Sequence, residues 1–226
     1  MSAYTFIYLK RLTVVVNKMG NTDASHPVKD MPLAYEKIKE IMDEETYKWH
    51  HDTHYAGYVN KRNEIEKELK TVDKSKANVN YSAIRSLKQE ETWNANGQIL
   101  HEIYWSTMGG DGKISDSMDI AKKIKEDFGS FDDFKAEFLA VGKSGRGWAV
   151  LVYDLFTDGK LRCVMYDFHN QGGIAGSLPV VAIDVFEHAY YHKYGPDRGA
   201  YLAALLNNID WSKADAKYKR YSAYKQ

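Results

Sequence analysis

The sequence predicts an α+β protein, in which an N-terminal antiparallel α-helical hairpin is followed by a C-terminal domain with a three-stranded antiparallel sheet and flanking helices. Two observations support this class. Between residues 43 and 108 the apolar residues recur at spacings of three and four, the periodicity of amphipathic helices. From residue 148 the pattern changes to short aromatic and β-branched runs, and the hairpin-turn signal Asp158-Gly159 separates the first two.

The first predicted helix begins at Asp43, whose carboxylate can cap it, and the acidic residues that follow suit the positive end of the helix dipole. One face of this helix carries Tyr47, His50, His54, Tyr58, Ile65 and Leu69. Glycine in a helix interior costs about 1 kcal/mol relative to alanine. We therefore interpret Gly57 as a position where another backbone comes close.

A second helix is predicted from residue 87 to 108, after a polar connection over residues 71–81. Two long helices joined by a polar link predict an antiparallel hairpin. The run Gly109-Gly110-Asp111-Gly112 should break the second helix and mark a domain boundary. The expected divisions are an N-terminal extension of unassigned role (1–25), a helical hairpin domain (26–109) and a C-terminal domain (110–226).

The C-terminal domain is predicted to begin with two short helices. The first ends at Gly129, and the second starts at Ser130, which is spaced from Asp133 as in a capping box. Strands are then expected over residues 148–156, 161–168 and 180–186. A last helix should follow over residues 196–208, with Pro196 in its first turn, where the missing N–H of proline does no harm.

Composition argues against several classes of function. The 31 Lys and Arg residues balance 31 Asp and Glu residues, so no net charge favours nucleic acid or an anionic membrane. No apolar run is long enough to cross a bilayer, and residues 1–25 contain no uninterrupted signal-peptide core, so we expect a soluble, cytoplasmic protein. The single cysteine, Cys163, excludes an internal disulfide and a cysteine-rich metal site, and we expect it to pack as a small core residue.

Side chains that can bind a metal gather in three parts of the sequence. They are His50 and His54 on the first helix, His101 on the second, and Asp184 and His188 after the last strand. Each alone has an ordinary explanation, such as a core histidine bonded to a carbonyl, a pair on a solvated helix face or a helix cap. An acid that closes an apolar strand, however, is costly to bury unless it is paired or bound to a metal. Three imidazoles and one carboxylate suit manganese, iron or zinc.

Six segments carry recognisable motifs. They are WHHDTHYAGYVN (49–60), HEIYW (101–105), FGSFDDFK (128–135), GRGWA (145–149), DVFEHAYY (184–191) and YLAALLNNIDW (201–211). In this order they resemble the iron/manganese superoxide dismutases, whose patterns include HHxxHHxxYVN, HxxFW, FGSxxxFK, GSGWAW and DVWEHAYY. The matches span about residues 32 to 212, so chance agreement is negligible although each motif alone is weak.

The resemblance implies disproportionation of superoxide to dioxygen and hydrogen peroxide, with one metal ion per subunit. The implied ligands are His50, His101, Asp184 and His188, with solvent in a fifth position. Manganese is favoured over iron for two reasons. Gln171 resembles the glutamine that bonds the solvent ligand in manganese-type members, and Gly97 stands where iron-type members carry their glutamine.

The resemblance also implies roles around the metal. Tyr58 and His54 should form the gate and the proton relay. Arg198 should steer superoxide by its charge, and Trp148 should form the wall behind the metal. Across a subunit interface, Tyr191 should bond the partner subunit's His54, and Glu187 should bond the partner subunit's His188. These roles require a homodimer, with a homotetramer as the alternative.

Four positions depart from the family pattern. Phe186 and Val150 stand where tryptophan is usual, which predicts a less filled wall, whereas Tyr55 and Thr53 replace a histidine and a lysine. Three other hypotheses compete with an active superoxide dismutase. They are a metal-binding relative without turnover, a zinc hydrolase, for which no HExxH-like motif is present, and a helical interaction module with satisfied core histidines.

Overall fold

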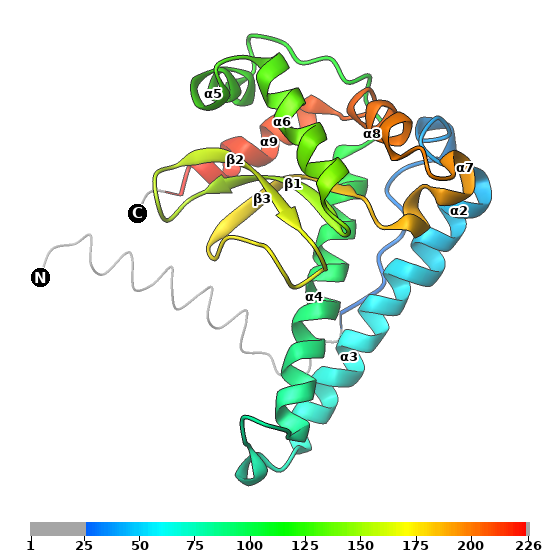
Figure 1. Cartoon of the computed structure of the whole chain (residues 1–226), viewed down its shortest axis with the longest axis vertical. Helices are drawn as coiled ribbons and strands as arrows, with labels where there is room; N and C mark the ends of the chain where they lie inside the picture. Colours follow the sequence, from blue (N-terminus) through cyan, green and yellow to red (C-terminus); the bar gives the residue numbers. More distant parts are fainter. Residues whose placement is uncertain (1–25, 225–226) are drawn as a thin grey trace, which may run out of the picture.

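The computed structural model describes residues 26–224, and the expected N-terminal extension lies outside the described residues. A long helical hairpin, α3 (Ala56–Thr71) and α4 (Ala83–Thr107), projects away from a three-stranded sheet (Figure 1). The sheet packs against α4 through β3 (Ser177–Asp184). Its other two strands, β1 (Trp148–Asp154) and β2 (Lys160–Tyr166), pack against helix α6 (Phe131–Ser144). The predicted α+β class is therefore confirmed.

The first helix runs from α2 (Glu44–Trp49) through a π-helical turn (His50–Tyr55) into α3. The side chain of Asp43 accepts a hydrogen bond of 2.8 Å from the backbone N–H of Thr46, which confirms the expected cap. A π-helical turn adds one residue to the helix, and such turns are frequent at functional sites. The added residue shifts the side chains that follow by about 100° around the helix axis.

The second helix starts at Ala83, earlier than residue 87, and its first turn includes the apolar, partly buried Ile84. It ends at a break where the φ angles of Gly109 and Gly112 are +89° and +68°. The break packs against the link between α8 (Arg198–Leu206) and α9 (Trp211–Ser222). The backbone N–H groups of Gly110 and Gly112 donate to carbonyls of that link at 2.9 and 3.1 Å.

The strands form an antiparallel sheet in the order β2-β1-β3, with β1 in the centre. The predicted turn follows Asp154, which pairs with Lys160, and Gly159 in that turn has a φ of +65°. At the other end of β1, Trp148 pairs with Asp184, the last residue of β3. Cys163 packs against the core but is only partly buried, so it lies at the core margin.

The helices of the C-terminal domain follow the prediction in part. α5 (Asp119–Phe128) ends at Gly129, and the hydroxyl of Ser130 caps α6 as expected. Pro196, in contrast, is not in the first turn of α8, because Asp197 caps that helix from outside it. A short helix, α7 (Tyr191–Tyr194), precedes α8, and α9 was not predicted. No described helix has both the length and the apolar character to cross a membrane.

The expectation for Gly57 is wrong. Among the described residues, no atom outside its own helix lies within 4 Å of the position that a Cβ would take there. The close backbone approach occurs instead at Gly110, where a Cβ would lie 2.5 Å from the carbonyl oxygen of Ile209 and 2.6 Å from Cα of Asp210.

Gly57→Ala is expected to raise the free energy of unfolding by about 0.5–1 kcal/mol, because alanine loses less backbone entropy in a helix. Gly110→Ala should lower it by about 1–3 kcal/mol through its collision with backbone. Chemical denaturation of both variants beside the parent protein measures these changes. A destabilised Gly57→Ala protein would show that Gly57 has a neighbour after all.

Candidate metal centre

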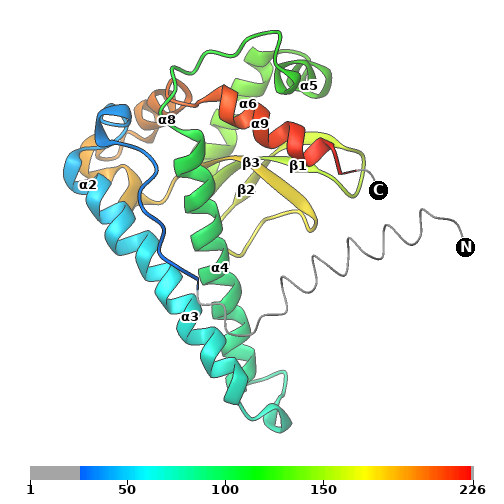
Figure 2. The ribbon, with the colours of Figure 1, turned by 180° about the vertical axis from the view of Figure 1, so that it is seen from behind.

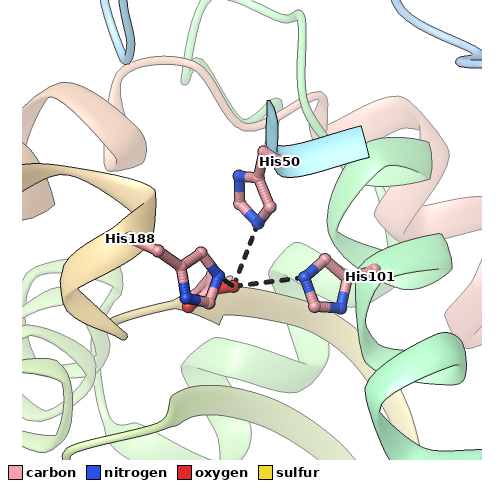
Figure 3. Close-up of side chains that lie close together, drawn as sticks. His50, His101 and His188 are labelled. Atoms are coloured by element: carbon pink, nitrogen blue, oxygen red, sulfur yellow. Dashed lines mark hydrogen bonds and ion pairs between the residues drawn. The ribbon is translucent and has the colours of Figure 1, made fainter. Parts of the chain in front are cut away.

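Four side chains that can bind a metal meet in the interior. His50, His101 and Asp184 are fully buried, and His188 is mostly buried. They come from the π-helical turn, α4, the end of β3 and the 3-10 turn Glu187–Ala189. One ligand atom of each lies within 4.8 Å of the others. Figure 3 shows the three histidines pointing toward the same carboxylate, and we call the four residues the buried cluster.

The distances within the buried cluster fit a shared metal ion. Oδ2 of Asp184 lies 3.1, 3.5 and 3.2 Å from the Nε2 atoms of His50, His101 and His188. Two atoms that are each about 2.1 Å from one ion lie about 3 Å apart when their bonds meet at right angles. Four donors at these separations can therefore surround one ion.

Backbone groups orient the carboxylate and one imidazole. Oδ1 of Asp184 accepts a hydrogen bond of 2.9 Å from the backbone N–H of Phe186, which leaves Oδ2 free for the cluster. Nδ1 of His101 lies 2.6 Å from the carbonyl oxygen of Gly97. Because a carbonyl can only accept, Nδ1 carries the proton and Nε2 presents its lone pair to the cluster. Outer hydrogen bonds of this kind hold metal ligands in place.

Burial decides the protonation of the buried cluster. It lowers the pKa of His50 and, further, that of His101, so both imidazoles are neutral. Burial alone would raise the pKa of Asp184, but His188 and His50 hold it well below its usual range. Neutral imidazoles and an ionised carboxylate are the forms that bind metals. Nε2 of His101 and Nε2 of His188 lack a hydrogen-bond partner within residues 26–224, and a metal ion would satisfy both.

Tryptophan rings close two sides of the buried cluster. Trp105 meets His50 edge to face, with ring centroids 4.7 Å apart. Trp148 meets His101 in the same way at 4.9 Å, and it is fully buried. Trp148 thus lies against His101, and Trp148 is the residue expected to form the wall behind the metal. These apolar walls lower the local dielectric and strengthen the electrostatic interactions inside.

Two rings stack against His188. His54 stacks at 4.0 Å and Phe186 at 5.5 Å between ring centroids, with interplanar angles of 18° and 14°. Burial, followed by the nearby His188, lowers the pKa of His54 to about 4, so His54 is neutral. Phe186 therefore fills part of the wall, whereas Val150 is buried in the centre of the sheet.

Tyr58 lies beside the cluster because Gly97 leaves room for it. A Cβ at Gly97 would lie 2.8 Å from Cγ of Tyr58, so the glycine allows the ring to reach His101 at a centroid distance of 5.3 Å. Burial raises the pKa of Tyr58, which keeps its hydroxyl protonated. Gly97 stands at the position where iron-type members carry their glutamine. It thus also makes room beside the cluster for Tyr58, the expected gate residue.

The expectation for Gln171 is wrong, and His169 occupies the place beside the cluster. Gln171 is exposed and bridges back to Phe168. His169 is fully buried, 4.6 Å from Tyr58 between ring centroids. The indole N–H of Trp148 donates to Nδ1 of His169 at 2.9 Å, so the proton of His169 is on Nε2, which has no partner among the described residues.

Three predicted residues lie outside the buried cluster. Glu187 is exposed, and the side chain of Tyr191 is 51% exposed. The guanidinium of Arg198 donates to the hydroxyl of Tyr190 at 3.1 Å and to the carbonyl of Gly145 at 2.6 Å, so it is anchored rather than free. Their functional roles remain predictions.

Comparison with known proteins gives one family for both parts of the chain. Residues 25–109 match the alpha-hairpin domain of the iron/manganese superoxide dismutases, and residues 116–217 match the C-terminal domain of that family.

Individual relatives carry either metal in their names. The Haloferax volcanii protein named superoxide dismutase [Mn] 2 is 37% identical over 196 residues, which cover 87% of this chain and 96% of the relative. Superoxide dismutase [Mn] 1 of Halobacterium salinarum is 36% identical over 84% of this chain and 93% of its own length. Superoxide dismutase [Fe] of Aquifex pyrophilus is 41% identical over 76% and 81%, respectively.

Manganese(II) added to metal-free protein is expected to raise the melting temperature by about 5–10 °C at a hundredfold excess over Kd, because the ion binds only the folded state. Differential scanning calorimetry of the parent and of His101→Ala measures this shift, which should vanish in the variant. His192→Ala, which removes a surface histidine, is the control and should keep it. An equal shift in His101→Ala would exclude the buried cluster as the binding site.

Proposed function

The chain belongs to the iron/manganese superoxide dismutase family, and we propose that the buried cluster holds its catalytic manganese or iron ion. The reaction converts two superoxide ions and two protons into one dioxygen and one hydrogen peroxide. The observation that carries the assignment is the convergence of three imidazole nitrogens on one buried carboxylate oxygen. No other group of three or more histidine, cysteine or acidic residues with this geometry occurs within residues 26–224.

The bound ion would supply the redox step, accepting an electron from one superoxide and returning it to the next. The residues of the chain then have three tasks. The carboxylate of Asp184 would balance part of the charge of the ion, the neutral imidazoles would donate lone pairs to it, and the tryptophan walls exclude bulk water. Tyr58 keeps its proton because burial raises its pKa, and it can donate a hydrogen bond beside the cluster. The Nε2–H of His169 is a further donor there, without a partner among the described residues.

The choice of metal now rests on fewer observations than the sequence suggested. With Gln171 on the surface, the glutamine argument for manganese is lost. Gly97 remains glycine, and Gln98 points elsewhere, toward Arg62 and Glu102 at 3.1 and 3.0 Å. The relatives include proteins named for manganese and for iron. We favour manganese, with iron as the alternative.

A homodimer would use the surface beside His188. Glu187 is exposed next to it, and the exposed side chains of Trp49 and Tyr191 carry large apolar area at 46% and 51% exposure. Exposed aromatic residues are enriched at protein interfaces. We propose that Glu187 bonds the partner subunit's His188 across this surface, which would orient that imidazole toward the metal.

Protein loaded with manganese, and separately with iron, is expected to remove superoxide in a rapid-mixing assay. Activity in neither form would refute the assignment. His169→Ala should retain its metal and lose activity by about 10–100-fold, because a hydrogen-bond donor beside the cluster is removed. Gln171→Ala is the matched control and should keep parental activity. Equal activity losses in both variants would contradict the placement of His169.

Light scattering at micromolar concentration is expected to give the mass of a dimer. Glu187→Ala should retain less metal than the parent after dialysis against a chelator, because the partner's imidazole loses its orienting carboxylate. Glu90→Ala removes an exposed acid from α4 and should behave like the parent. A monomer with full metal content and activity would rule out the proposed role of Glu187.

A further inference from the structure

A pocket of about 370 Å³ lies between α4, the end of α9 and the segment that precedes α2. Figure 2 shows this segment running along the hairpin and α9 crossing near α4. The pocket has the volume of a small ligand-binding site. None of the four residues of the buried cluster lines it, although it shares one wall, Trp105, with the metal centre. We call it the α9 pocket.

The wall that α9 contributes carries two positive charges, Lys217 and Arg220, for which no ion pair is found among the described residues. Lys217 is half-buried and has no hydrogen bond or ion pair with any described residue. Arg220 is exposed, and its one described contact places the guanidinium 5.3 Å from the centre of the Tyr221 ring. Burial lowers the pKa of Lys217 and Arg220 lowers it further, whereas the nearby Glu102 opposes this shift without reversing it. A half-buried cation without a counter-charge is costly, and an anion in the pocket would compensate this cost.

The carboxylates of the α9 pocket supply only part of that compensation: Glu102 favours the charged form of Lys217 electrostatically, but no described carboxylate forms an ion pair with it. Glu102 is already engaged by Lys29, by the hydroxyl of Tyr55 at 3.1 Å and by the amide of Gln98 at 3.0 Å. The other acid of the lining, Asp30, is exposed and forms no ion pair within the described chain. The charge of Lys217 and Arg220 is therefore available to a ligand.

The remaining lining suits the body of an organic molecule. Ile99 is 41% exposed, and Ile103, Pro32 and Tyr221 contribute further apolar surface. Trp105, which is 2% exposed, also lines the pocket, and its indole N–H has no partner among the described residues. Ligand sites in proteins combine mostly apolar walls with a few polar groups that fix the orientation of the ligand.

We propose that the α9 pocket binds a small organic anion, whose carboxylate or phosphate group is held by Lys217 and Arg220 and whose apolar body lies against Ile99 and Tyr221. Charge-assisted hydrogen bonds from a lysine and an arginine are among the stronger polar interactions, and arginine matches planar anions with two N–H groups. The site is independent of the reaction proposed for the metal centre.

Calorimetric titration of the metal-loaded protein with benzoate and with phenyl phosphate tests the proposal. At least one of them should bind with a Kd below about 1 mM, and the better one identifies the preferred anionic group. Benzyl alcohol, which has the same ring but no charge, should bind at least about tenfold more weakly. Absence of binding by both anions, or equal binding of the alcohol, would overturn the proposal.

Lys217→Gln should weaken binding of the preferred anion by about tenfold or more, the scale of one charge-assisted hydrogen bond. Lys125→Gln removes an exposed lysine from α5 and should leave binding unchanged. Lys217→Met provides a readout that needs no ligand: it should melt above the parent, because an uncompensated half-buried charge is replaced by an apolar side chain. Unchanged binding in Lys217→Gln would reject the site.

Discussion

Asp184 ends β3 in a place without solvent, and its carboxylate carries a negative charge there. An isolated ionised carboxylate in a protein interior would be neutralised or expelled unless several groups compensated it. Here one oxygen is held by the backbone of Phe186, and the other is surrounded by imidazole nitrogens from three different elements. A metal ion held by these four residues would complete the compensation. This requirement explains why elements from both ends of the chain converge at one point.

The scaffold around Asp184 is built to keep that point fixed. The antiparallel register places Trp148 opposite Asp184, and the hydroxyl of Tyr201 donates to the backbone carbonyl of Asp184 at 2.8 Å. α4 packs along β3 and carries His101 to the cluster, where the carbonyl of Gly97 sets the tautomer. Because protein interiors are close-packed, a shift of any of these elements would move a ligand atom. The hairpin and the sheet therefore hold the cluster residues in place together, although they belong to different parts of the chain.

Much of this arrangement could be predicted from sequence, and the failures have physical causes. The fold class and the cluster residues were predictable because helix periodicity, the Asp-Gly turn and short contiguous motifs carry them. His169 was missed because it and Gln171 are polar residues of one loop, and only the bridge from Phe168 to Gln171 decides which of them faces inward. α9 was missed because its lysine-rich sequence gains its buried face from tertiary packing, chiefly through Trp211 and Ala214.

The roles of two helix glycines also depend on tertiary structure and could not be predicted from sequence. Gly57 and Gly97 both interrupt good helix formers, and each could mark a close neighbour. The π-helical turn decides between them, because it changes which side of the first helix faces α4 and so directs Tyr58 toward Gly97. A Cβ at Gly97 would displace the Tyr58 ring, and with it the hydroxyl that lies beside the cluster. Gly97 is thus required by the geometry of the site itself.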